Sequence, residues 1–305
     1  MITIITSTLN CREALEQTAA SIREQRQAQL QWSNEDGGST DSTPDVGQRH
    51  KDLASHLFLE GGKRLSPDSP VSRSLLPRVA VVTVVRNGAA TIEACIQSVT
   101  AQTYPNVEHV IVDGISTDST VDILRAHDSD IEYWVSEPDE GIYNALNKAI
   151  ELIGAEWYVV LGCDDLLFPE AVEKLMRHAR DSLLVFGQVE FFSQTKGMLY
   201  IRNHSAGVLI STEAHRLFGT YDESYRIAAD TKFLSCARLA GVTKEIPDVV
   251  GAFFVGGASG NYRKNIEEHA RAMRESGAWG TLRTWAWILP RRVRALFRSR
   301  ASRLR

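Results

Sequence analysis

Apolar and polar residues follow two different periods along residues 79–180, and these periods predict strands and helices in turn. Four short apolar runs, most of them rich in valine, are typical of buried strands: 79–85, 107–112, 131–135 and 157–161. Each run precedes a segment with helical spacing of its apolar residues: 89–102, 118–127, 141–153 and 169–179. The alternation indicates an α/β fold with a mostly parallel sheet covered by helices on both faces.

The pattern changes beyond this region. Residues 183–201 predict two or three strands joined by short turns, and further helices are expected at 212–218, 229–240 and 262–276. We therefore expect one main domain over 78–260, with a smaller region after the parallel strands. Residues 261–305 are expected to form C-terminal helices that end in a basic amphipathic tail.

Residues 1–43 repeat residues 78–120 at an offset of 77 positions without a gap. Twelve of the 43 positions are identical, and most of them lie in the run 36–43, which falls on 113–120. Residues 30–35 are too polar for a buried parallel strand, so the first copy reads as a partial strand–helix–turn fragment. Residues 44–77 read as a linker, because 60–77 hold three prolines, two glycines and four serines. The fragment is a decayed copy or an arm that packs on the main domain.

Composition limits the class of protein. The chain has 305 residues, of which 43% are hydrophobic and 24% charged, as expected for a globular protein. No apolar run is long enough for a spanning helix, and the N-terminus does not resemble a signal peptide. The four cysteines lack metal-binding spacing, which indicates reduced thiols. We expect a cytoplasmic protein.

Charge is distributed unevenly along the chain. Residues 281–305 contain eight arginines and no acidic residue, whereas residues 1–280 carry a net charge of −12. Tryptophan and leucine are interleaved with these arginines, a composition typical of a helix that lies on an anionic membrane. The sequence therefore predicts peripheral contact of 281–305 with the inner face of a membrane. Nucleic acid is not expected as a partner, because the rest of the chain is not basic.

Polar residues follow the expected parallel strands, where open α/β sheets bind ligands. Asn87, Asp113, the segment 136–141 and the adjacent Asp164 and Asp165 occupy these positions. Two neighbouring carboxylates repel each other unless a cation lies between them, and their hard oxygens suit Mg²⁺ or Mn²⁺. No GxGxxG or GxxxxGK[ST] motif follows any strand, which argues against dinucleotide-binding dehydrogenases and P-loop nucleotidases.

Six motifs, in this order and spacing, resemble the family 2 glycosyltransferases with the GT-A fold: TVVRNG (83–88), VDGISTDST (112–120), SEPDEGIYNALNKAI (136–150), LGCDD (161–165), IAAD (227–230) and VGGAS (255–259). The resemblance covers 79–260 and is greatest to the branch found in bacterial capsule, exopolysaccharide and O-antigen gene clusters. It implies a nucleotide-binding sheet with a smaller acceptor-side region.

The resemblance also implies roles for individual residues. Thr83, Val85 and Asn87 would wall the base, and Asp113 would hydrogen-bond it. Asp139, Gly141 and Asn147 would lie near the ribose and diphosphate. Asp164 and Asp165 would bind Mn²⁺ or Mg²⁺ and with it the diphosphate, Asp230 would be the catalytic base, and His204 would lie on the acceptor side. The chain departs from the family pattern at Ile115, which replaces a glycine, and at Ser205, which replaces a glutamine.

The expected function is transfer of a single sugar from a nucleoside-diphosphate sugar to a saccharide or lipid-linked saccharide. A base on the acceptor side and a cation on the leaving-group side suit in-line displacement, which predicts inversion. The QxxRW motif of processive synthases is absent after Asp230. The alternatives are a catalytically inactive sugar-nucleotide-binding or scaffold protein, and a nucleotidyltransferase. The joint presence of the four carboxylates argues against an inactive protein, and the sparse first loop, Arg86-Asn87-Gly88, argues against a nucleotidyltransferase.

Overall fold

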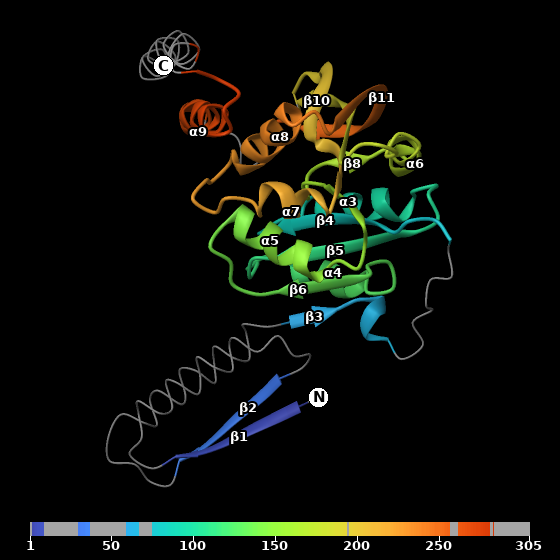
Figure 1. The fold of residues 1–305 in the computed structure, drawn as a ribbon. Helices are drawn as coiled ribbons and strands as arrows, with labels where there is room; N and C mark the ends of the chain where they lie inside the picture. Colours follow the sequence, from blue (N-terminus) through green and yellow to red (C-terminus); the bar gives the residue numbers. More distant parts are fainter. Residues whose placement is uncertain are drawn as a thin grey trace.

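A nine-stranded sheet forms the centre of the molecule and carries helices on both faces (Figure 1). The computed structural model describes residues 2–8, 30–36, 59–66, 75–193, 195–256, 262–280 and 283. Within these residues the strand order is β3-β6-β5-β4-β7-β10-β9-β11-β8. The predicted α/β fold is therefore confirmed.

The parallel half of the sheet follows the apolar runs closely. Its strands are β4 (Val79–Val85), β5 (Val107–Asp113), β6 (Tyr133–Ser136) and β7 (Trp157–Val160). The intervening helices are α3 (Ile92–Thr100), α4 (Thr120–Ala126) and α5 (Ile142–Leu152), and α6 (Ala171–Met176) follows β7. All four strands run in the same direction, so their carboxyl ends lie along one edge of the sheet.

The second half of the sheet is mixed. β9 (Leu184–Ser193) and β10 (Gly197–Ser211) form an antiparallel hairpin, and β10 pairs with β7. The other elements are β8 (Leu166–Leu167), β11 (Thr243–Phe254), α7 (Ala214–Phe218), α8 (Ala229–Leu239) and α9 (Tyr262–Glu275). The sequence pattern does not predict β11, because Pro247 and Asp248 interrupt it. The strand accommodates both with a register shift between Glu245 and Val249.

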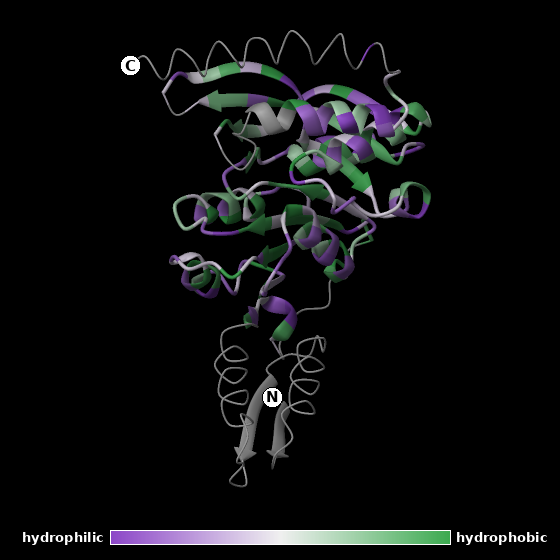
Figure 2. Cartoon of the chain, turned by 90° about the vertical axis from the view of Figure 1, so that its left-hand side faces the viewer, coloured by the Kyte–Doolittle hydropathy of each residue, from purple (hydrophilic) through white to green (hydrophobic). Residues whose placement is uncertain are grey.

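Side chains alternate across each strand and so supply two cores. Val79 and Val81 of β4 pack with α3 and α6, whereas Ala80 and Val82 pack with α5 and α8. Figure 2 shows hydrophobic residues concentrated in the central strands. None of the helices described in the structure is long and apolar enough to cross a membrane.

The first copy of the repeat contains a second strand, contrary to the sequence prediction. β1 (Ile2–Thr8) and β2 (Leu30–Asp36) pair in parallel, with Ile2 opposite Leu30. β4 and β5 pair with Val79 opposite Val107, so both copies have the same register at the offset of 77. The prediction was wrong because it required a strand buried on both faces. Strand pairing itself uses backbone groups, which polar residues also have.

The expected linker over 44–77 is interrupted by structure, so that prediction was wrong for 59–66. β3 (Leu59–Gly61) pairs antiparallel with β6, and a 3₁₀ turn (Lys63–Leu65) follows it. The Asp128 carboxylate accepts hydrogen bonds from the Gly62 amide and the Trp134 indole, both at 2.7 Å. Gly62 has φ 108°, a conformation that favours glycine. The glycines that indicated a linker thus serve a tight turn at the sheet edge.

Acid should destabilise the protein through His109, which is fully buried in β5. Its Nε2 lies 3.0 Å from the Thr83 hydroxyl, and burial lowers the pKa of the ring from 6.5 to about 3. Between these values the unfolded chain binds a proton that the folded chain does not. The free energy of unfolding therefore falls as pH drops from 6.5 towards 3, by about 1.4 kcal/mol per pH unit for this group.

Urea unfolding at a series of pH values measures this slope. We expect the slope of the free energy of unfolding against pH to be smaller in H109Q, by the amount that one titrating proton contributes. Identical slopes for the wild type and the variant would contradict this assignment.

Candidate functional site

The loops that follow the four parallel strands contact one another and form a continuous rim. The loops after β4 and β5 are joined by two hydrogen bonds. The Asn87 amide donates to the Ser116 hydroxyl at 2.7 Å, and the Thr117 amide donates to the Asn87 side chain at 2.7 Å. A Cβ on Gly88 would lie 3.2 Å from the sulfur of Cys163, in the loop after β7. The rim therefore brings together polar residues that are up to about 80 positions apart in the sequence.

The loop after β6 joins the same rim at Gly114. A Cβ at Gly114 would overlap a carboxylate oxygen of Asp139, so a larger residue would have to displace that side chain. The other oxygen of Asp139 accepts from the Gly141 amide at 2.9 Å. Gly141 is exposed, has φ 134° and precedes α5. Asp139 and Gly141 thus lie beside the loop that begins at Asp113, as the sequence predicts.

Asp113 lies at the end of β5 and has no exposed surface. Its carboxylate accepts hydrogen bonds from the Ser116 amide at 2.9 Å, the Ser136 hydroxyl at 2.6 Å and the Ser116 hydroxyl. The two serines therefore occupy the carboxylate, and a ligand would have to displace at least one of these hydrogen bonds to bind it. Ile115, where the family pattern has glycine, has φ 53°, which is costly for a β-branched residue.

Thr83 and Val85 are buried in the protein, whereas side chains that contact a nucleotide base must be accessible to it. Thr83 is fully buried, and its hydroxyl contacts His109. Val85 is 4% exposed and belongs to the core on the α3 face. Their side chains belong to the core beneath the loops, whereas Asn87 is itself part of the rim.

Asp164 and Asp165 lie together after β7, and both carboxylates approach Gly162. A Cβ on Gly162 would lie 2.7 Å from an oxygen of Asp165 and 3.0 Å from an oxygen of Asp164. The other Asp165 oxygen accepts from the Phe254 amide at 3.0 Å, which ties the pair to the end of β11. Asp164 is partly exposed, whereas Asp165 is 3% exposed.

The charge and the neighbours of this pair make its residues candidate ligands of a divalent cation. Burial, together with the charge of Asp164, raises the pKa of Asp165 to about 7. No ion pair among the described residues involves either carboxylate, and those residues include no cluster of three or more metal-ligating side chains. A divalent cation would favour the charged form of both carboxylates, and Mn²⁺ or Mg²⁺ held there would take its remaining ligands from phosphate and water.

Asp230 lies in the first turn of α8, and one of its oxygens accepts both of its hydrogen bonds. The Tyr143 hydroxyl of α5 donates to Oδ1 at 3.0 Å, and the Thr231 amide donates to the same atom at 2.7 Å. No hydrogen bond from a described residue reaches Oδ2. Burial and the adjacent Asp230 carboxylate raise the pKa of Tyr143, so its hydroxyl stays protonated.

His204 lies in the middle of β10, and its ring packs against aromatic rings of β9 and β11. Its ring lies 4.0 Å from that of Phe253, next in the chain to Phe254, whose amide binds Asp165. Burial lowers the pKa of His204 to about 4, while the charge of Asp230 acts in the opposite direction. His204 is therefore neutral at pH 7 and lies within range of the charge of Asp230.

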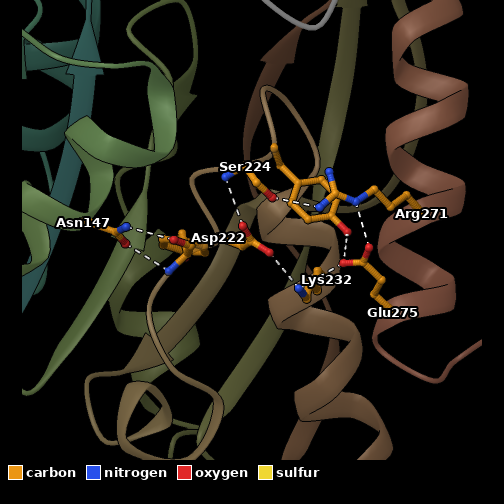
Figure 3. Close-up of polar contacts among 8 residues, drawn as sticks. Asn147, Asp222, Ser224, Lys232, Arg271 and Glu275 are labelled. Atoms are coloured by element: carbon orange, nitrogen blue, oxygen red, sulfur yellow. Dashed lines mark hydrogen bonds and ion pairs between the residues drawn. The ribbon is translucent and has the colours of Figure 1, made fainter.

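The resemblance implies that Asn147 lies near the ribose and diphosphate, but its hydrogen-bond partners are residues of the protein. Its side-chain amide donates to the Tyr221 carbonyl at 2.9 Å and to Glu223 at 2.8 Å, and its oxygen accepts from the Tyr221 amide at 3.0 Å. Figure 3 shows Asn147 directed towards the segment that contains Asp222 and Ser224. The residue thus contacts the loop before α8.

Sequence reasoning missed Tyr143 and the Phe254 amide as parts of the site. Tyr143 stands within the 136–150 motif at a helical spacing from apolar residues, so its position indicates only a core residue. The Phe254 amide is a backbone group of an unpredicted strand, and no sequence signal marks it. Membrane contact was predicted for 281–305, and only Arg283 of this segment is among the described residues.

Solved structures with a similar fold have the GT-A-like architecture. A mannosyltransferase from Pyrobaculum calidifontis, in complex with GDP-Man and Mn²⁺, aligns with a TM-score of 0.57 at 20% identity, covering 78% of this chain and 80% of that one. TarS 1–349 of S. aureus, in complex with UDP-GlcNAc, aligns with a TM-score of 0.55 at 15% identity, covering 69% and 70%. The fold is therefore GT-A-like.

The chain belongs to glycosyl transferase family 2, whose family model matches residues 80–237. A PGL/p-HBAD biosynthesis glycosyltransferase of Mycobacterium bovis is 29% identical over 198 residues, covering 58% of this chain and 77% of the relative. A further glycosyltransferase, of Mycobacterium tuberculosis, is 30% identical over 182 residues, covering 53% and 70%. The protein is therefore a glycosyltransferase that uses nucleotide sugars.

Proposed function

We propose that the protein transfers a single sugar from a nucleoside-diphosphate sugar to a saccharide hydroxyl, with inversion and with a divalent cation. The observation that carries this proposal is the pair of carboxylates, Asp164 and Asp165, that lies over Gly162 at the edge of the parallel sheet. Asp230 supports it, because both of its hydrogen bonds reach Oδ1 and no described residue donates to Oδ2.

On the donor side, Asp164 and Asp165 would hold Mn²⁺ or Mg²⁺. A cation bound there neutralises negative charge on the diphosphate as it departs. The Mn²⁺ and GDP-Man named for the Pyrobaculum enzyme support this assignment. Asn87 lies next to the loop of Asp164 and Asp165, and Asp113 lies one strand further along the rim. The base would bind there once the serines that cover Asp113 have moved.

On the acceptor side, Oδ2 of Asp230 takes the proton of the attacking hydroxyl. The hydroxyl oxygen bonds to the anomeric carbon while the bond from that carbon to the diphosphate oxygen breaks. With the base on the acceptor side and the leaving group on the cation side, in-line displacement would invert the configuration. His204, which is neutral and feels the charge of Asp230, would contact the acceptor.

Release of nucleoside diphosphate tests the proposed activity. Purified protein is incubated with a panel of UDP-, GDP- and dTDP-sugars, with Mn²⁺, Mg²⁺ or EDTA, and with saccharide acceptors. We expect release with one donor class, dependent on the cation and stimulated by an acceptor, and an inverted linkage in the product by NMR. A donor that raises the thermal midpoint without any release would instead identify an inactive binding or scaffold protein.

The acceptor is proposed to be lipid-linked, of the kind used to assemble capsule, exopolysaccharide or O-antigen, with the protein peripheral on the cytoplasmic face. The β9–β10 hairpin supports this. Its residues 198–201 (Met-Leu-Tyr-Ile) are 39–53% exposed, and the guanidinium of Arg202 lies 5.8 Å from the Tyr200 ring. Consecutive exposed apolar residues beside a cation suit insertion into an anionic membrane interface. The basic tail 281–305 would act with it.

We expect replacement of Met198, Leu199 and Ile201 by serine to reduce binding to vesicles of phosphatidylglycerol and phosphatidylcholine several-fold, because each side chain loses apolar area to bury. Vesicle co-sedimentation measures binding, and release of nucleoside diphosphate with a soluble acceptor should stay unchanged. Leu217 and Leu239, exposed elsewhere, are matched serine controls. Equal binding of the hairpin variant and the wild type would contradict membrane contact by the hairpin.

A further inference from the structure

The helix α5 contacts both the catalytic carboxylate and the loop that precedes it. Tyr143 donates to Asp230, and one turn later Asn147 binds the backbone of Tyr221 through both its carbonyl and its amide. Between them, Asn144 donates to Glu223 at 3.1 Å. Residues at positions i, i+1 and i+4 of one helix thus contact the segment 221–230.

The same loop is held from its other side by α9. Lys232 lies 2.8 Å from Asp222 and 3.2 Å from Glu275, and Arg271 donates to Ser224 and Glu275 (Figure 3). The hydrogen bonds with Lys232 and Ser224 lower the pKa of Asp222 to about 2, so this carboxylate stays charged. The loop is therefore fixed by α5, by Lys232 of α8 and by Arg271 of α9, and α5 supplies the hydroxyl that binds Asp230.

We propose that Tyr143 and Asn147 are positioning residues for Asp230. This inference rests on the proposed function, in which Asp230 is the base. The Tyr143 hydroxyl and the Thr231 amide occupy Oδ1, which directs the other oxygen to the acceptor hydroxyl. Asn147 acts through the loop and not on the donor, because its partners are Tyr221 and Glu223.

The two assignments for Asn147 predict different kinetics. A donor ligand lost from the ribose or diphosphate raises the KM for the nucleotide sugar, whereas a misplaced base lowers kcat. We expect Y143F and N147A each to lower kcat about ten- to a hundred-fold, with the donor KM unchanged, because small misplacements of a reacting group cost rates of this order.

The experiment compares Y143F, N147A and D230N with Y104F, using saturation kinetics for donor and acceptor and the thermal midpoint. Tyr104 donates a 2.8 Å hydrogen bond to the Pro77 carbonyl, so Y104F removes a similar bond elsewhere and should keep wild-type kinetics. A raised donor KM in N147A, or wild-type kcat in Y143F while D230N is inactive, would overturn the inference. Wild-type activity in D230N would instead overturn the proposed catalytic base.

Discussion

Replacing Asp230 with asparagine is expected to lower kcat about 10²- to 10⁴-fold, the usual contribution of a general base. Asparagine keeps the size of the side chain, and its oxygen still accepts from Tyr143 and Thr231. The amide nitrogen then occupies the position of Oδ2 and cannot take a proton. Donor binding, measured by thermal shift with a nucleotide sugar and Mn²⁺, should therefore stay as in the wild type.

Asp181 offers a matched control for this substitution. It is exposed and has φ 63°, a conformation that asparagine also adopts readily, so D181N should be silent in stability and activity. Transfer by D230N at a rate near that of the wild type would show that another group removes the acceptor proton.

Replacing Asp165 with asparagine is expected to separate stability from activity. The wild-type carboxylate is 3% exposed and lies beside Asp164, so its charge is costly without a cation. Asparagine can still accept from the Phe254 amide and removes the repulsion. We therefore expect D165N to melt at or above the wild-type midpoint in EDTA.

Activity should change in the opposite direction. Loss of one of two carboxylates that hold the cation should lower kcat/KM by about a hundred-fold or more, since charge stabilisation by a metal amounts to several kcal/mol. The stabilisation of the wild type by Mn²⁺ plus donor should also disappear in D165N. A D165N protein that is still stabilised by Mn²⁺ and still active would show that the cation binds elsewhere or is not needed.

The sequence was sufficient to predict the rim, because the carboxyl ends of parallel strands lie at one edge of a sheet. Valine-rich runs located those ends, and Asp113, Asp139 and Asp164 follow them within four residues. The assignment of Asn147 depended instead on resemblance to a motif. Its contacts are made across 74 positions to the backbone of Tyr221, which hydrophobic period and motif order do not encode.

The hydrophobic pattern also failed to predict two strands near the ends of the sheet, β11 and β3. β11 contains a proline. β3 has only three residues, of which the last is Gly61, and Gly62 follows it. Both are stabilised by their neighbours: β11 pairs with β9, and β3 lies against β6 and Asp128. Local composition cannot reveal partners of this kind, because tertiary contacts override local preference.

The shared register of the two repeat copies has a consequence for folding. As the chain is synthesised, β1 and β2 are made before β4 and β5, and either pair could offer the same backbone hydrogen bonds to a growing sheet. At the repeat offset, Asn34 and Glu35 correspond to Ile111 and Val112, which are completely buried. Placing an amide and a carboxylate there would cost several kcal/mol. The polarity that distinguishes the first copy therefore prevents it from taking the place of the second.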